Sequence, residues 1–144
     1  MLQKKEILFI QIGKEAFAVE INQVKRFVTN VEISDCDIKD KAPIILGMIC
    51  THDEVIPVLD LYKWFRQESI HLDESTVFVV VTCEGKSFAF PIDDVIMRCE
   101  VSDKCFHAVP AVFRKESGNP FREVIDWNGK LYLKISGEII SKGI

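Results

Sequence analysis

Large hydrophobic residues fall at every second position in two short segments that lie 71 positions apart. They are Phe17, Val19 and Ile21 in the first segment and Phe88, Phe90 and Ile92 in the second. Successive side chains of a β-strand point to opposite faces, so a period of two places one apolar row on a single face. Both segments are therefore predicted to be half-buried antiparallel strands.

The two segments belong to a longer internal repeat. Residues 17–24 align with residues 88–95, and residues 48–55 align with residues 124–131 at a spacing of 76, so the second copy contains a small insertion. A unit that occurs only twice indicates paired subdomains, because a solenoid needs about three copies or more.

Each copy is predicted to contain the same series of elements. The first three strands are expected at residues 7–12, 17–21 and 24–29 in one copy, and at residues 77–83, 88–92 and 95–101 in the other. Asn22 and Asp93 are expected to cap a short helical turn before the third strand. A hairpin follows, with a strong turn signal at Asn128-Gly129 and a weaker counterpart at His52-Asp53.

About five short strands per copy, joined by tight turns, are typical of a small antiparallel barrel. The predicted fold class is all-β, with two small intertwined five-stranded barrels and short helical turns, including closing helices after Asp60 and Ser136. Residues 1–144 are predicted to form a single domain, with the first barrel over about residues 7–65 and the second over about residues 76–140. The side chains expected to be well buried are Phe17, Ile21, Ile49, Val55, Phe88, Ile92, Ile125 and Leu131.

Net charge and the lengths of the apolar runs indicate which partners are not expected. The chain has 144 residues, a formal net charge of −4 and a pI of about 5.4, whereas proteins that bind nucleic acid normally carry a basic surplus. No apolar run approaches the roughly 20 residues that span a bilayer, and the apolar run at residues 7–10 is too short for a signal peptide. We therefore expect a cytoplasmic protein that binds neither nucleic acid nor membrane directly.

The search for reactive groups yields one weak candidate. Five cysteines occur without a CxxC pair, and Cys50 and His52 lie two residues apart on one predicted strand face. A zinc site needs three or four ligands, and no further cysteine or histidine stands at a suitable spacing. We therefore expect no catalytic residue, cofactor or metal, and function is expected to reside in the surface. A divergent barrel that binds a small ligand, or has thiol chemistry at Cys50 and His52, stays open as an alternative.

Two segments carry a family resemblance. Residues 12–24 contain a predicted hairpin and an alternating strand, and residues 43–49 (P-I-I-L-G-M-I) lead into residues 55–61 (V-I-P-V-L-D-L). Both segments resemble the CheW family of chemotaxis adaptors, and the second is the more specific of the two. The likeness extends from about residue 7 to residue 140. It implies two SH3-like barrels and a scaffold that joins chemoreceptor tips to the histidine kinase CheA. Receptor tips would dock in an apolar groove between the barrels, and the kinase regulatory domain mainly on the first barrel.

Residues are carried over from this resemblance by position. Val24, Gly47, Val77 and Ala89 match places that the family uses for partner contacts. Three further positions depart from the family pattern: Arg26 replaces a glutamate, His52 replaces an arginine, and Arg98 replaces an apolar residue. These departures predict altered partner choice, so an adaptor for another CheA-like pathway, such as surface motility, is a further hypothesis.

Overall fold

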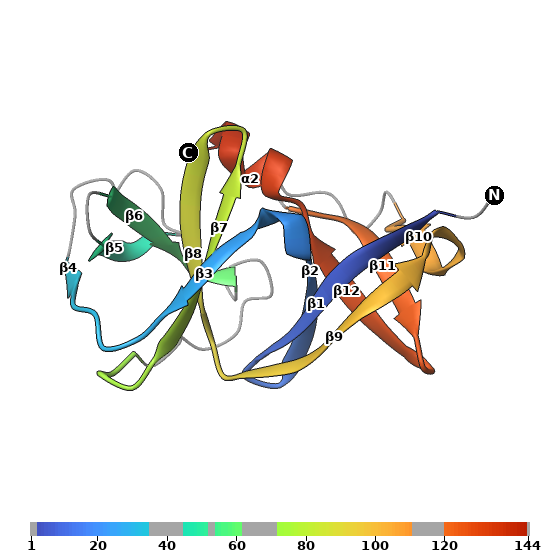
Figure 1. Ribbon diagram of the computed structural model, residues 1–144, viewed down its shortest axis with the longest axis horizontal. Helices are drawn as coiled ribbons and strands as arrows, with labels where there is room; N and C mark the ends of the chain where they lie inside the picture. Colours follow the sequence, from blue (N-terminus) through green and yellow to red (C-terminus); the bar gives the residue numbers. More distant parts are fainter. Residues whose placement is uncertain (1–2, 35–44, 52–53, 62–71, 111–119, 144) are drawn as a thin grey trace. The chain divides into compact units, whose positions relative to one another are not determined.

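The computed structural model describes residues 3–34, 45–51, 54–61, 72–110 and 120–143, and these form two six-stranded β-sheets (Figure 1). The chain divides into two compact units: unit 1 consists of residues 1–24 and 93–144, and unit 2 of residues 25–92. The all-β class predicted from the alternation is confirmed. None of the helices in the described residues is long and apolar enough to cross a membrane.

Unit 1 contains the sheet with strand order β10-β11-β12-β2-β1-β9. Its strands are β1 (Lys4–Ile12), β2 (Glu15–Glu20), β9 (Asp94–Ser102), β10 (Phe106–Ala108), β11 (Phe121–Trp127) and β12 (Lys130–Ile135). The 3-10 turns η1 (Ile21–Gln23) and η3 (Asp103–Cys105) and the helix α2 (Gly137–Gly143) complete the unit. The closing helix predicted after Ser136 is confirmed, because α2 begins at the next residue. The Ser136 hydroxyl accepts a hydrogen bond from the Ile139 N–H at 3.4 Å.

Unit 2 contains the sheet with strand order β3-β7-β8-β6-β5-β4. Its strands are β3 (Val24–Val28), β4 (Ile33–Ser34), β5 (Ile45–Thr51), β6 (Glu54–Leu59), β7 (Val77–Cys83) and β8 (Lys86–Ile92). Each sheet has six strands rather than the expected five. The additional strands are the very short β4 and β10, which are too brief to show a period in the sequence.

The two sheets are equivalent under the repeat. Strands β1, β2 and β9–β12 of unit 1 take the same places as β7, β8 and β3–β6 of unit 2. In each sheet one parallel pair, β2 with β12 or β8 with β6, lies among antiparallel neighbours. Lys134 lies opposite Ala18 in the first of these pairs and Val58 opposite Ala89 in the second, which are the same positions at the repeat spacings of 71 and 76. The structure thus confirms the internal repeat.

The units exchange their first hairpins. The β1–β2 hairpin belongs to the first copy, yet β1 pairs with β9 and β2 with β12, both from the second copy. The β7–β8 hairpin likewise joins the sheet that contains β3 to β6. Each unit thus combines segments from both copies, as expected for intertwined barrels, and the barrel bounds at about residues 7–65 and 76–140 stay a prediction. The local pattern shows which face of a strand is apolar, but not which strand lies beside it.

Each unit has its own hydrophobic core, and five of the six positions in each core are equivalent under the repeat. The core of unit 1 contains Ile7, Phe9, Ala18, Val101, Ile125 and Tyr132, and the core of unit 2 contains Ile49, Ile56, Val58, Phe78, Val80 and Ala89. Phe9 packs against Tyr132 with ring centroids 4.5 Å apart and stacks on Trp127 at 6.4 Å. In unit 2 the buried rings of Phe88 and Phe90 meet edge to face at 5.6 Å.

The predicted burial is confirmed for five of the eight residues and wrong for two. Phe17, Ile49, Phe88, Ile92 and Ile125 are buried, and Ile21 is half-buried. Val55 and Leu131, which occupy equivalent positions in the repeat, are 63% and 68% exposed. Their neighbours Ile56 and Tyr132 face the cores instead. Each of these strands has two apolar residues in succession. Assigning the first of the two to the core, instead of the second, moves every side chain of the strand to the wrong face of the sheet.

One predicted turn, at Asn128-Gly129, agrees with the structure, whereas the turn expected at Asp93 does not. Asn128 and Gly129 have positive φ angles of 51° and 77°, as the hairpin prediction requires. A short helical turn, η1, precedes β3 as predicted, but Asn22 lies inside it and the capping residue is Glu20. No helical turn follows Asp93; its carboxylate accepts a hydrogen bond from the Gly13 N–H, and its own N–H donates to the Gln11 carbonyl at 2.8 Å. The turn at His52-Asp53 and the helix expected after Asp60 fall on positions outside the described residues.

Candidate functional site

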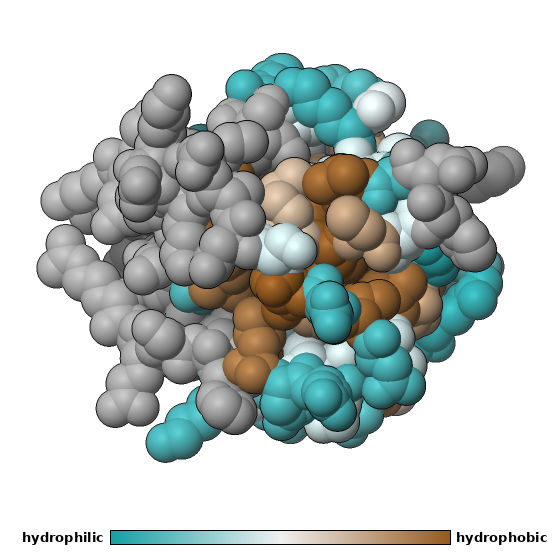
Figure 2. Space-filling model, turned by 90° about the vertical axis from the view of Figure 1, so that its left-hand side faces the viewer, coloured by the Kyte–Doolittle hydropathy of each residue, from teal (hydrophilic) through white to brown (hydrophobic). Residues whose placement is uncertain are grey.

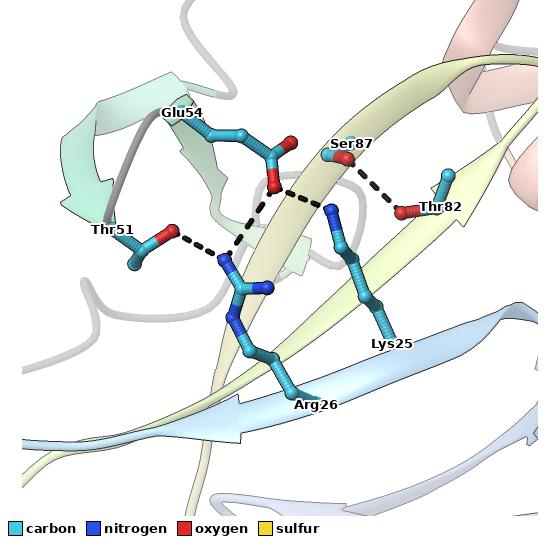
Figure 3. Close-up of polar contacts among 6 residues, drawn as sticks. All are labelled: Lys25, Arg26, Thr51, Glu54, Thr82 and Ser87. Atoms are coloured by element: carbon cyan, nitrogen blue, oxygen red, sulfur yellow. Dashed lines mark hydrogen bonds and ion pairs between the residues drawn. The ribbon is translucent and has the colours of Figure 1, made fainter.

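A polar cluster on unit 2 brings together three strands at the surface (Figure 3). Lys25 and Arg26 lie on β3, Thr51 ends β5 and Glu54 begins β6. Thr51 and Glu54 are opposite each other at the end of the β5–β6 hairpin, so their side chains project together. The hairpin thereby presents an acceptor pair to the cationic side chains of β3.

Glu54 is the centre of this cluster. Its Oε1 atom accepts a hydrogen bond from the Lys25 ammonium and lies 3.5 Å from Nη2 of Arg26. The same Arg26 nitrogen donates to the Thr51 hydroxyl. Lys25, Arg26 and Glu54 are each about one-third exposed, so the cluster reaches solvent. Two cations share one carboxylate, and the cluster therefore carries a positive surplus.

The cluster also shifts the titration of Glu54. The hydrogen bond from Lys25 is the largest influence and holds the pKa of the carboxyl below its ordinary value of 4.5, while the Ser87 hydroxyl and the charge of Arg26 act in the same direction and desolvation opposes them. Ser87 is in turn linked to the Thr82 hydroxyl at 3.0 Å across the β7–β8 hairpin. The ionised form of Glu54 is thus the form that unit 2 stabilises.

We expect Glu54 to make the stability of the protein dependent on acid. Because its pKa is lower in the folded chain than in the unfolded chain, its contribution is present above 4.5 and is lost as pH falls through the folded pKa. Urea denaturation at pH 7 should therefore show Glu54→Gln to be less stable than wild type, and the difference should shrink as the pH falls below 4.5. Lys25→Met should remove most of the same difference. Parallel stability profiles for wild type and Glu54→Gln would contradict this assignment.

Exposed apolar side chains lie on the same two strands as members of the cluster. In the described part of unit 2, the large hydrophobic residues that are exposed are Phe27 on β3 and Val55 on β6, each next in sequence to a member of the cluster. Figure 2 shows hydrophobic surface among hydrophilic side chains on the side of unit 2 that carries β4 to β6. Isolated exposed hydrophobic residues are common. Successive side chains of a strand point to opposite faces, so Phe27 shares a face of β3 with Lys25, whereas Val55 lies on the face of β6 opposite Glu54.

Unit 1 has an exposed strip along β9. Val95, Ile96 and Met97 are each at least 40% exposed, and Arg98 follows them. Nη2 of Arg98 lies 2.9 Å from a carboxylate oxygen of Glu6 on the neighbouring strand β1. The predicted apolar-to-arginine departure at position 98 is thus accommodated by a surface ion pair.

A second charged cluster lies in unit 1. Nζ of Lys134 on β12 is 3.7 Å from Glu20 on β2 and 3.2 Å from Glu123 on β11, and Nζ of Lys5 is 3.4 Å from the other oxygen of Glu20. These side chains line a polar cavity of about 310 Å³, which the start of α2 also borders. The side chain of Lys134 is only 11% exposed. Every cation named here faces a carboxylate of the same cluster.

The structure places the predicted partner-binding residues in different environments. Val24 and Val77 are half-buried at the starts of β3 and β7, whereas Gly47 and Ala89 are buried. Ala89 belongs to the core of unit 2, and a Cβ atom at Gly47 would meet the Ser34 carbonyl oxygen of β4 at 2.8 Å. Both small residues are thus enclosed by unit 2 itself. His52 falls outside the described residues.

Sequence reasoning identified Arg26 but missed its partners. Lys25, Thr51 and Glu54 were not identified as site residues from the sequence. The available signal was the hairpin: residues on either side of the expected turn at positions 52–53 must lie opposite each other, which places Thr51 beside Glu54. That β3 lies next to them could not be derived from local pattern.

The structure offers little support for metal or thiol chemistry. Among the described residues, no group of three or more histidine, cysteine, aspartate or glutamate side chains is placed to hold a metal ion. Cys50 is exposed near the end of β5. The pair with His52 cannot be built from the described positions, so the thiol hypothesis gains no observation.

Comparisons with known proteins agree on one family. The family model for the CheW-like domain matches residues 6–142. A similar solved structure is the scaffolding protein TtCheW from Thermoanaerobacter tengcongensis, with a TM-score of 0.78 and 19% sequence identity, covering 93% of this chain and 90% of that one. No curated protein sequence matches the chain. Because the family model extends over nearly the whole sequence, this chain belongs to the CheW-like domain family.

Proposed function

We propose that this protein is a non-enzymatic adaptor that couples chemoreceptors to a CheA-type histidine kinase in bacterial chemotaxis. The observation that carries the proposal is the match of the CheW-like family model over residues 6–142. Its fold neighbour TtCheW is described as a scaffolding protein. An adaptor of this kind works in the cytoplasm, where receptor tips and the kinase are found, and needs no cofactor.

The surface of unit 2 supports a role in binding. Lys25, Arg26 and Glu54 form a solvent-accessible cluster with a positive surplus, and Phe27 is an exposed apolar residue two positions from Lys25 on β3. Charges at docking surfaces chiefly determine specificity and association rate, whereas apolar anchors contribute affinity. We place Arg26 and His52 at the kinase contact, and Val24, Val77 and Arg98 at the edges of the partner surfaces. Gly47 and Ala89 act through the packing of unit 2.

The direct test reconstitutes the adaptor. Purified protein, the kinase regulatory domain from the same cell and the cytoplasmic tip of a co-encoded receptor are mixed and separated by size. We expect a ternary complex that does not form when this protein is omitted. The proposal is wrong if the receptor tip and the kinase domain do not associate in the presence of this protein and neither of them binds this protein alone.

Partner choice is expected to depend on the charge of the unit 2 cluster. Arg26→Glu combined with His52→Arg restores the family's usual charges, so this variant should bind a typical CheA regulatory domain at least about tenfold more tightly than wild type does. Titration calorimetry measures the two affinities. Equal affinities would show that the departures at these positions do not retune recognition.

A second variant separates recognition from local folding. Arg26→Glu places two carboxylates side by side, whereas Arg26→Glu with Glu54→Arg keeps an ion pair and reverses its direction. Because Glu54→Arg would also face Lys25, the exchange is made in a Lys25→Met background, where it should melt close to the Lys25→Met protein yet lose affinity for the native kinase. If it binds the native kinase as wild type does, the cluster lies outside the interface.

A further inference from the structure

When the chain folds, each of the two exchanged hairpins must join the correct sheet. The β1–β2 and β7–β8 hairpins join β12 and β6 through parallel pairs with the same register. Each hairpin thus offers the same backbone edge. In an alternative arrangement with one barrel per repeat copy, β2 would pair with β6 and β8 with β12, and the backbone pairs would be equivalent. The backbone alone does not distinguish the two arrangements, so side chains must do so.

The side chains differ at the junction. Position 134 in β12 is lysine where the equivalent residue of β6 is Val58, which is fully buried. Position 20 in β2 is glutamate where β8 has Pro91. In the observed arrangement Lys134 and Glu20 face each other at 3.7 Å in a largely enclosed site. The only ion pair in the described residues that joins β2 to β12 is therefore absent from the β8–β6 junction.

The alternative arrangement would break this pair. With β8 beside β12, Lys134 would face Pro91 and keep only Glu123 of its own copy. With β2 beside β6, the Glu20 carboxylate would lie next to Val58. Removing one partner of a mostly buried charge is costly, because the remaining charge is poorly solvated.

We propose that the Lys134–Glu20 pair decides which of the two equivalent hairpins completes which sheet, and so enforces the exchange between repeat copies. The pair is well suited to this role because its members come from different copies of the repeat. Lys5 also faces Glu20, at 3.4 Å, but β1 and β2 form one hairpin and move together. The Lys5–Glu20 pair is present in both arrangements and cannot distinguish them.

Lys134→Val tests the proposal, since it copies the residue of the equivalent junction. Lys134→Val removes one partner of the pair and leaves Glu20 with Lys5 alone, so the urea midpoint should fall. The fraction of misassembled chain after refolding should rise about five- to thirtyfold. Lys134→Val combined with Glu20→Leu replaces both partners, so this variant should recover the midpoint but not the single refolded species. Misassembly is measured as a second set of amide signals in NMR spectra and as hairpin-exchanged dimers in size-exclusion chromatography. Glu20→Gln should act in the same direction.

Lys5→Met is the matched control and should refold to one species. Lys134→Arg keeps the ion pair and should also behave as wild type. The proposal is overturned if Lys134→Val refolds to a single monomeric species, if Lys5→Met produces equal heterogeneity, or if Lys134→Val fails to fold, which would make the pair a simple requirement for stability. These outcomes do not depend on partner binding, so they are independent of the adaptor function.

Discussion

Truncation of Phe88 to alanine is expected to lower the free energy of unfolding by about 3–5 kcal/mol, the usual range for removing a fully buried phenylalanine. The Phe88 side chain is completely buried on β8 and packs edge to face on Phe90. Its loss leaves a cavity that strands on both sides can fill only partly. Urea denaturation measures the change, which approaches the entire stability of many small domains.

Leu131→Ala is the matched comparison for this experiment. Leu131 is a large hydrophobic residue on a strand of the same kind, but it is 68% exposed at the start of β12. Its truncation should change the free energy of unfolding by less than about 0.5 kcal/mol. If Leu131→Ala were as damaging as Phe88→Ala, the register of the β11–β12 hairpin would be shifted by one residue.

The second large effect is expected at Gly47. A Cβ atom there would lie 2.6 Å from Cγ2 of Ile33 and 2.8 Å from the Ser34 carbonyl oxygen, so β4 would have to move away from β5. Overpacking of this kind costs about 1–3 kcal/mol. Gly47→Ala should therefore lower the urea midpoint, and partner binding should decline only with the folded fraction.

A double-mutant cycle with Ile33→Ala tests the mechanism. Ile33→Ala removes one of the two clashing atoms, so the double variant should be destabilised by less than the sum of the single variants. A strictly additive result would mean that β4 does not press on Gly47. Loss of binding by a fully folded Gly47→Ala protein would instead place this residue in the interface.

The hairpins were within reach of sequence reasoning because their determinants are local. Asn128-Gly129 adopts positive φ at both positions with little strain, and the alternation around Phe17 and Phe88 identifies the buried face. The same reasoning failed at Val55 and Leu131, where an apolar neighbour follows directly and the alternation supports two registers. Here the choice depends on contacts across the sheet.

The site was less predictable than the fold. Arg26 drew attention because it departs from the family pattern, but its partner Glu54 lies on another strand, 28 positions along the chain. Gly47 offers a similar lesson: its equivalent in unit 1 is Glu123, so the bulge shared by β5 and β11 does not itself require glycine. The requirement arises from β4, which the sequence pattern did not predict.

The hairpin exchange also has a consequence during protein synthesis. The β1–β2 hairpin leaves the ribosome first, but its partners β9 to β12 begin at residue 94. At a translation rate of roughly 5–20 residues per second, the hairpin waits about 4–15 seconds before its neighbours exist. Residues 25–92, which make up unit 2, are all synthesised in that interval. The nascent chain therefore exposes the apolar strand β1 for seconds, and a ribosome-associated chaperone that shields residues 7–12 should raise the yield of soluble protein.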